Sequence, residues 1–200
     1  MERLTIGAYW GPRKESSSAC AARAMVMIDK LSHASPLLAV WLQGGLGKKQ
    51  KIETVNSSQD FDRLFAASNL RQLNKIDESL RESVGFHLML WNGQKNTEKI
   101  SNLGIGCGKF GSELTNAVYL ELPRELSSQT CEDVFGRDVL EALIDSWDPD
   151  WAAAYYHKTR HDPFLDRMLF VKNVSQLPRD FKESKVSARS YGSGLVYESI

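Results

Sequence analysis

Two aspartates flank a proline near residue 149, and such a pair of carboxylates can serve a hydrolytic site. Asp148 and Asp150 stand in the run Trp147-Asp148-Pro149-Asp150-Trp151. Hydrolases use two carboxyls in different environments as general acid and general base. Asp-Pro-Asp after a helix is, however, a common turn sequence, and the chain has no Gly-x-Ser-x-Gly nucleophile motif. The sequence therefore favours a turn at this position.

Two other motifs suggest chemistry, and each has a simpler interpretation. His157 and His161 lie four residues apart, a spacing that places two imidazoles on one metal if the segment is helical. The Glu of the metalloprotease motif is missing and Pro163 follows, so a solvated basic loop is favoured. The glycines of Gly104–Gly111 resemble a phosphate-binding loop, but a strand and not a helix is expected after them. We expect no catalytic residue, no metal and no cofactor.

Acidic residues gather between Glu113 and Asp150, where ten acids face two bases for a local charge of −8. Asp138, Glu141, Asp145 and Asp148 follow three-to-four spacing and would share one face of a helix. Like charges so placed destabilise a helix, and a basic partner would supply a benefit through faster encounter and complementary pairing. A solvated face balanced by lysines and arginines of the tail remains the alternative.

The bulk composition describes an ordinary globular chain of 200 residues with no formal net charge. No stretch has the features of a signal peptide or a membrane span, so a cytoplasmic protein without a membrane partner is expected. Cys20, Cys107 and Cys131 are widely spaced and predict reduced core thiols. The basic residues after Lys158 lack interleaved aromatics, so no nucleic-acid partner is expected.

Hydrophobic spacing predicts the elements that would position these residues. Strands are expected at Leu4–Trp10, Gly85–Trp91, Ile100–Phe110, Thr115–Leu122, Ala152–Tyr156, Leu165–Val174 and Leu195–Tyr197. Helices are expected at Ser16–His33, from Pro36 through Leu42, at about 60–80, and at Cys131–Trp147 with Thr130 as cap. The second and third strands are expected to be joined across a turn signal at Asn92-Gly93 and to pair antiparallel. The expected helices and strands come in separate blocks and not as regular βα units. This order predicts an α+β fold, a largely antiparallel sheet packed with several helices, in a single domain of residues 1–200.

Short motifs recur in an order that covers about three quarters of the chain. They are Gly7-Ala8-Tyr9-Trp10-Gly11-Pro12-Arg13 with Glu15, Cys20-Ala21 with Arg23, Leu90-Trp91-Asn92-Gly93, Cys107-Gly108, Asn116, Leu122-Pro123 and Trp147-Asp148-Pro149-Asp150-Trp151. This set resembles the immunity protein 52 family of bacterial polymorphic toxin systems. The likeness weakens after Trp151, where the Gly-Trp dipeptide expected before a late strand is missing.

The resemblance implies an α+β immunity protein, not an enzyme, that neutralises a toxin nuclease of the restriction-endonuclease fold, commonly delivered by a type VI secretion system. A nuclease cleft receives phosphates, so carboxylates of an inhibitor can cover it. The hypothesis for the partner-binding surface is Asp138, Glu141, Asp145, Asp148 and Asp150. A structural role is expected for the motif residues Tyr9, Trp10, Gly11, Arg13, Trp91, Asn92, Gly93, Cys107, Gly108, Trp147, Pro149 and Trp151. A small carboxylate-dependent hydrolase and a nucleic-acid-binding protein remain the alternatives.

Overall fold

The structure is a computed structural model that describes residues 3–44, 52–73, 83–111, 115–127, 134–156, 168–173, 175, 177 and 186–199. Its strands are β1 (Leu4–Trp10), β2 (Leu42–Gln43), β3 (Glu53–Thr54), β4 (Phe86–Trp91), β5 (Asn102–Cys107), β6 (Asn116–Glu121), β7 (Trp151–Tyr156), β8 (Met168–Val171), β9 (Val186–Tyr191) and β10 (Gly194–Ser199). Its helices are α1 (Ser17–Ala34), the 3₁₀ turn η1 (Pro36–Leu38), α2 (Ser58–Leu73), α3 (Arg124–Ser127) and α4 (Val134–Trp147).

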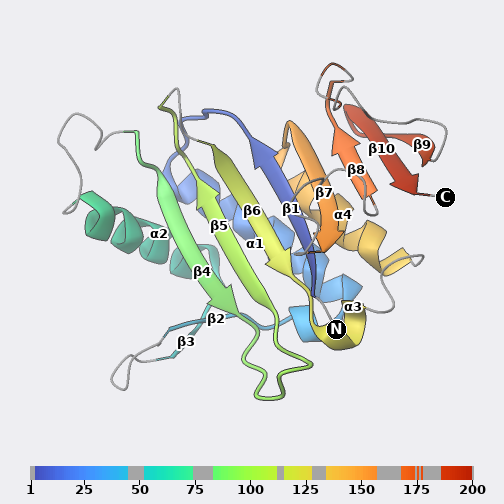
Figure 1. Cartoon of the computed structure of the whole chain (residues 1–200). Coiled ribbons are helices and arrows are strands. Elements are labelled where there is room, and N and C mark those ends of the chain that lie inside the picture. The colour runs from blue at the N-terminus through green and yellow to red at the C-terminus, as the bar shows by residue number, and fades with distance from the viewer. Residues whose placement is uncertain are drawn as a thin grey trace.

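The described strands form one sheet in the order β3-β2-β4-β5-β6-β1-β7-β8-β10-β9, and each pair is antiparallel. The three long helices α2, α1 and α4 lie side by side behind it in Figure 1, with α1 in the middle. We call the opposite side of the sheet the outer face. Helices and strands thus occupy separate layers, which confirms the α+β class and the antiparallel sheet expected from the sequence.

Strand β1 lies near the centre of the sheet because alternate side chains suit a buried face. Leu4, Ile6 and Ala8 are fully buried beneath the helices, whereas Thr5 and Tyr9 belong to the outer face. Helix α1 buries its Cys20, Ala24, Met27 and Leu31 stripe against this strand and its neighbours. Ser16 caps the helix by accepting the backbone N–H of Ala19, as its position before the apolar stripe predicts.

One local expectation is wrong. The helix expected from Pro36 through Leu42 is only the short turn η1, because the Trp41 side chain turns into the core and donates to Leu38 O. Asn92-Gly93 leads from β4 into the connection to β5, and the two strands pair antiparallel as expected. The buried Asn92 amide donates to Leu37 O and Lys99 O and accepts Ser101 N–H, which holds this loop.

The other element boundaries differ by a few residues or lie partly outside the described residues. Strand β5 ends at Cys107, before Gly108 at a φ of 72°. The expected helix end after Leu73, the Thr130 cap with residues 131–133, and the strand residues 165–167 and 174 lie outside the described ranges. Strands β2, β3 and β9 were not expected from the sequence.

Candidate functional site

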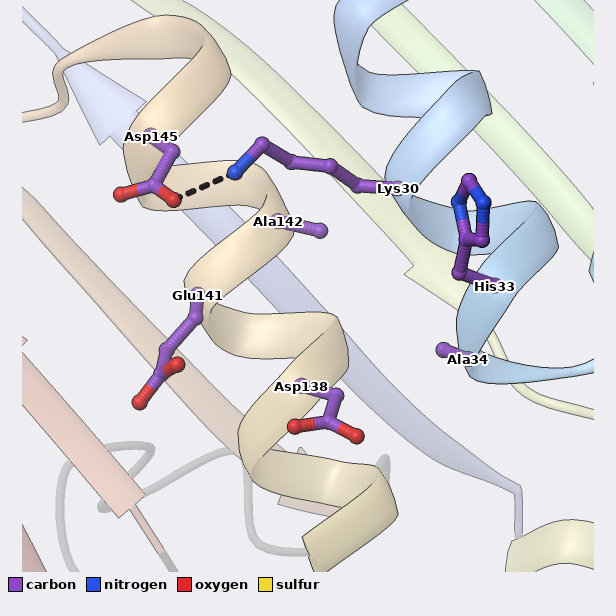
Figure 2. Close-up of a pocket in the computed structure, with 7 residues that line it drawn as sticks. All are labelled: Lys30, His33, Ala34, Asp138, Glu141, Ala142 and Asp145. Carbon is purple, nitrogen blue, oxygen red and sulfur yellow. Dashed lines mark hydrogen bonds and ion pairs between the residues drawn. The ribbon is translucent and has the colours of Figure 1, made fainter.

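The acidic face of α4 borders a groove against α1, shown in Figure 2. The groove has a volume of about 330 Å³ and is lined by Lys30, His33, Ala34, Asp138, Glu141, Ala142 and Asp145. Helical spacing places the three carboxylates on the solvent side, while Val139, Leu140, Leu143 and Trp147 of the same helix are fully buried. The structure therefore brings three of the five proposed partner-binding residues together on one helix.

Two of these three carboxylates are balanced by cations of the same chain. Asp145 Oδ2 lies 2.6 Å from Lys30 Nζ, which reaches across from α1, and Asp145 Oδ1 accepts from the Tyr191 hydroxyl at 2.9 Å. Glu141 points away from α1 in Figure 2 and pairs with Arg189 of β9. Burial first, and then this hydrogen bond to Asp145, raise the pKa of Tyr191. Internal pairing thus accounts for part of the acidic stripe, as the alternative left open by the sequence supposed.

Asp138 differs from its neighbours on the helix. It is exposed, lines the groove and makes no ion pair with another residue of the described ranges. The adjacent Arg137 instead pairs with Glu198 of β10 at 2.7 Å. An incoming cation can therefore approach Asp138 without displacing a partner from this part of the chain.

Asp148 and Asp150 occupy the turn from α4 to β7, away from the groove. Asp148 has a φ of 46°, is 57% exposed and pairs with Lys172 at 2.8 Å. The Asp150 carboxylate accepts the backbone N–H of Gly11 at 2.8 Å, and its own N–H donates to Tyr9 O. Each carboxylate therefore has a contact that stabilises the turn, which is the role favoured by the sequence over an acid–base pair.

The opening motif and the Trp-Asp-Pro-Asp-Trp motif meet at the carboxyl end of α4. Arg13 Nη2 donates to Trp147 O at 2.7 Å, and Arg23 Nη1 donates to Ser146 O at 3.0 Å. Glu15, whose side chain is only 10% exposed, joins the two guanidiniums at 3.1 and 2.7 Å. Carbonyls of the last helical turn lack partners within the helix and attract positive charge, so the two arginines satisfy this end of α4.

Aromatic rings extend the same junction on both sides of the sheet. The Trp10 ring stacks on the Trp147 ring at 5.3 Å, and the Arg13 guanidinium lies 5.0 Å from the Trp10 ring centre. Tyr9 stacks on Trp151 at 4.0 Å on the outer face. These contacts link the two motifs to each other and are made by the motif residues Tyr9, Trp10, Arg13, Trp147 and Trp151.

The remaining motif residues also have internal contacts. The Cys107 thiol is buried and hydrogen-bonded to Cys20, and burial is the main cause that raises its pKa. Gly108 allows the Phe86 ring to approach, since a Cβ there would lie 2.9 Å from two ring atoms. These positions suit packing better than reaction chemistry.

Several of the candidate chemical sites find no support in the described ranges. His157 and His161 lie outside them, as does Cys131. Within them no group of three or more His, Cys, Asp and Glu side chains is arranged to hold a metal ion. Gly104–Cys107 belong to strand β5, not to a loop that leads into a helix.

None of the described helices has both the length and the apolarity that crossing a membrane requires.

The sequence indicated the basic tail as a source of cations that balance the acidic stripe, and Lys172 and Arg189 of that tail pair with Asp148 and Glu141. Sequence reasoning missed Lys30, which pairs with Asp145 from α1. The pairing of β9 with β10, which carries Arg189 to α4, has no strong hydrophobic alternation that would have predicted it.

Comparisons with known proteins agree with this fold. The model of the family immunity protein 52 matches residues 2–174, beyond the Trp151 at which the motif resemblance weakens. No curated protein sequence matches the chain. Among solved structures, the Pseudomonas aeruginosa T6SS protein PA0821 is similar, with a TM-score of 0.52 and 12% sequence identity. That alignment covers 98% of this chain and 64% of the other, so this chain spans less than two thirds of its length.

The extent of the family match defines the class as that of immunity proteins. The chain belongs to the immunity protein 52 family.

Proposed function

We propose that this protein binds and neutralises a cognate nuclease toxin, delivered between bacteria by a type VI secretion system, in the cytoplasm of the cell that it protects. Membership of the immunity family supports a toxin as the partner. The similar Pseudomonas aeruginosa protein is a T6SS protein, which supports the secretion route. The observation that carries the nuclease assignment is the acidic face of α4, with Asp138 exposed beside a groove.

The carboxylates of this face complement a toxin surface that normally binds phosphates. A nuclease cleft presents lysines and arginines to the nucleic-acid backbone, and carboxylates attract the same groups. Asp138 makes no ion pair within the described ranges and can bind such a cation directly. Glu141 and Asp145 can each accept a further cation beside Arg189 and Lys30. The proposal also includes Asp148 and Asp150 of the turn after α4, outside the groove, where Asp148 is exposed beside Lys172 and Asp150 accepts from Gly11.

The decisive functional test is rescue of cells that express the toxin encoded by the neighbouring gene. Co-expression of this chain should restore growth, and purified chain should inhibit cleavage of DNA or RNA by the purified toxin. Failure of rescue with both proteins soluble would count against the proposed function. Measurable hydrolysis lost on replacing Asp148 or Asp150, or salt-sensitive nucleic-acid binding without any toxin, would point to the two alternative classes.

The role of α4 is tested by Asp138→Lys, with Asp29→Lys as control. Both aspartates are exposed on long helices of the same layer, but only Asp138 lines the groove. Asp138→Lys should slow association with the inactivated toxin about tenfold at low salt and less at high salt, because surface charges steer encounter and salt screens them. Equal association rates and equal salt dependence for wild type and both variants would show that α4 is not part of the interface.

A further inference from the structure

The outer face of the sheet carries large side chains that alternate with glycine and alanine across neighbouring strands. One row of the register runs Met89, Gly104, Tyr119, Gly7, Ala153 and Leu169. The next row runs His87, Gly106, Ala117, Tyr9, Trp151 and Val171. Met89 is 44% exposed and His87 is also exposed, so the β4 side of this face is open to solvent.

The glycines let the tyrosine rings lie down on the sheet. A Cβ added to Gly104 would fall 2.3 Å from Tyr119 Cζ, and one added to Gly7 would fall 2.4 Å from the Tyr9 hydroxyl oxygen. The Tyr119 hydroxyl donates to Met89 Sδ at 3.2 Å, which fixes the ring between β4 and β6. A flat tyrosine surface held in one conformation loses little entropy on binding, which is why tyrosine is enriched in protein interfaces.

Toward β8 and β10 the same face is covered by apolar residues of this chain. Leu169, Val171, Tyr197 and Ala153 form a second buried cluster, against which Leu177 and Trp151 pack. Trp151 in turn stacks on Tyr9 at 4.0 Å. The outer face therefore buries apolar side chains beside β8 and β10 and continues as an exposed surface around Met89 and Tyr119.

A cation without a carboxylate partner borders this exposed part. Lys109 Nζ would lie 3.3 Å from a Cβ at Gly106, donates to Thr115 O at 3.2 Å, and forms no ion pair within the described ranges. The neighbouring His87 is held toward its neutral form, because burial first, and the charge of Lys109 second, lower its pKa. At neutral pH the local charge of this corner is therefore positive.

We infer that Met89, Tyr119 and Lys109 form a second docking surface, which binds an acidic and apolar patch of the toxin outside its phosphate-binding cleft. The inference rests on the proposed function for the identity of the partner. A second copy of the chain fits less well, because Glu121, the carboxylate that the described residues place on this face, is already held by Arg3 at 3.6 Å and by Asn102 at 2.8 Å. A different protein is therefore the better source of an acid that complements Lys109.

The test compares Lys109→Glu and Met89→Glu with the control Lys95→Glu, using the inactivated toxin as probe. Lys95 is an exposed lysine in the loop between β4 and β5, away from Tyr119. We expect Kd to rise about tenfold or more for each variant of the patch, a loss of about 1.4 kcal/mol, and less than about twofold for Lys95→Glu. Thermal unfolding checks that each variant folds, and Tyr119→Phe, which removes only the hydroxyl, should raise Kd less than Met89→Glu.

The outcomes separate this inference from the proposed function. If wild type and Lys95→Glu bind the toxin and the two patch variants bind equally well, the inference is overturned and the proposed function stands. If wild type fails to bind the toxin at all, both are overturned. A dimer of this chain that Met89→Glu dissociates without changing toxin affinity would assign the patch to a second copy and overturn the inference.

Discussion

At the scale of single residues, Glu15 is the side chain on which the junction of the two motifs depends. It joins Arg13 and Arg23, and both guanidiniums hold carbonyls at the end of α4. Glu15→Gln keeps the shape and removes the charge, leaving two partly buried cations without a counterion. The free energy of unfolding should fall by roughly 2 to 4 kcal/mol, which urea denaturation measures.

The matched control is Glu98→Gln, at an exposed pair. Glu98 lies 3.2 Å from Arg124, but the two side chains are 52% and 40% exposed. Exposed ion pairs contribute about 0 to 1 kcal/mol, so the control should change stability little. Equal losses for both variants would show that Glu15 has no special role.

The sequence placed the residues of this junction in one family pattern but could not reveal their contacts. Arg13 and Trp147 are separated by 134 positions, and nothing in either local sequence states that a guanidinium reaches a helix end. The helical face of Asp138, Glu141 and Asp145 was predictable because it depends only on spacing within α4. The basic tail was also predictable as a source of counterions, but the pairing of Lys30 and Arg189 with particular carboxylates depends on helix packing and strand order.

At the scale of elements, the hairpin of β9 and β10 is joined to α4 by charge. Glu198 of β10 pairs with Arg137 at 2.7 Å and with Arg189 at 3.4 Å. Burial is the largest influence and acts to raise the pKa of Glu198, but hydrogen bonds and charge from the two arginines together outweigh it. The pKa of Glu198 in the folded protein therefore lies below its ordinary value of 4.5.

A lowered carboxyl pKa makes this attachment sensitive to acid. The contribution of Glu198 to stability is present above its unfolded pKa and is lost as pH falls through the lower folded value. Wild type should exceed Glu198→Gln in free energy of unfolding by a constant amount above about pH 5, and the difference should shrink toward pH 3. Urea denaturation from pH 3 to 7 measures it, and a pH-independent difference would contradict the assignment.

Elements with strong apolar periodicity were predicted well, and those without it were missed. Strand β1 was predicted with its observed bounds, and α1 within one residue at each end, because each presents a regular buried stripe. Strands β2 and β3 are two residues long, too short for any period. Strand β9 has small and polar residues, and its pairing with β10 follows from the turn at Gly192.

At the scale of the whole molecule, the two proposed binding surfaces lie on opposite sides of the sheet. Asp138 belongs to the helix layer, whereas Met89 and Tyr119 belong to the outer face. One toxin surface cannot contact both unless it wraps around an edge of the sheet. The double variant Asp138→Lys with Met89→Glu should therefore lose binding free energy close to the sum of the single losses, since distant sites add. A strongly non-additive result would indicate that the two surfaces are coupled and do not act as independent contacts.

We also propose that residues 1–200 fold as one domain, in which the C-terminal hairpin is part of the core although the family match ends at residue 174. Val196 of β10 is fully buried in the main core, and Tyr197 is 5% exposed in the second cluster. Removing both side chains costs roughly 3 to 6 kcal/mol of burial, a large part of the about 5 to 15 kcal/mol that stabilises a typical domain.

The full chain should unfold in one transition by circular dichroism and tryptophan fluorescence. A chain ending at residue 174 should lose that transition and aggregate, because β8 becomes an apolar edge strand. A truncated chain that unfolds cooperatively at the wild-type midpoint would show that the hairpin is an independent addition.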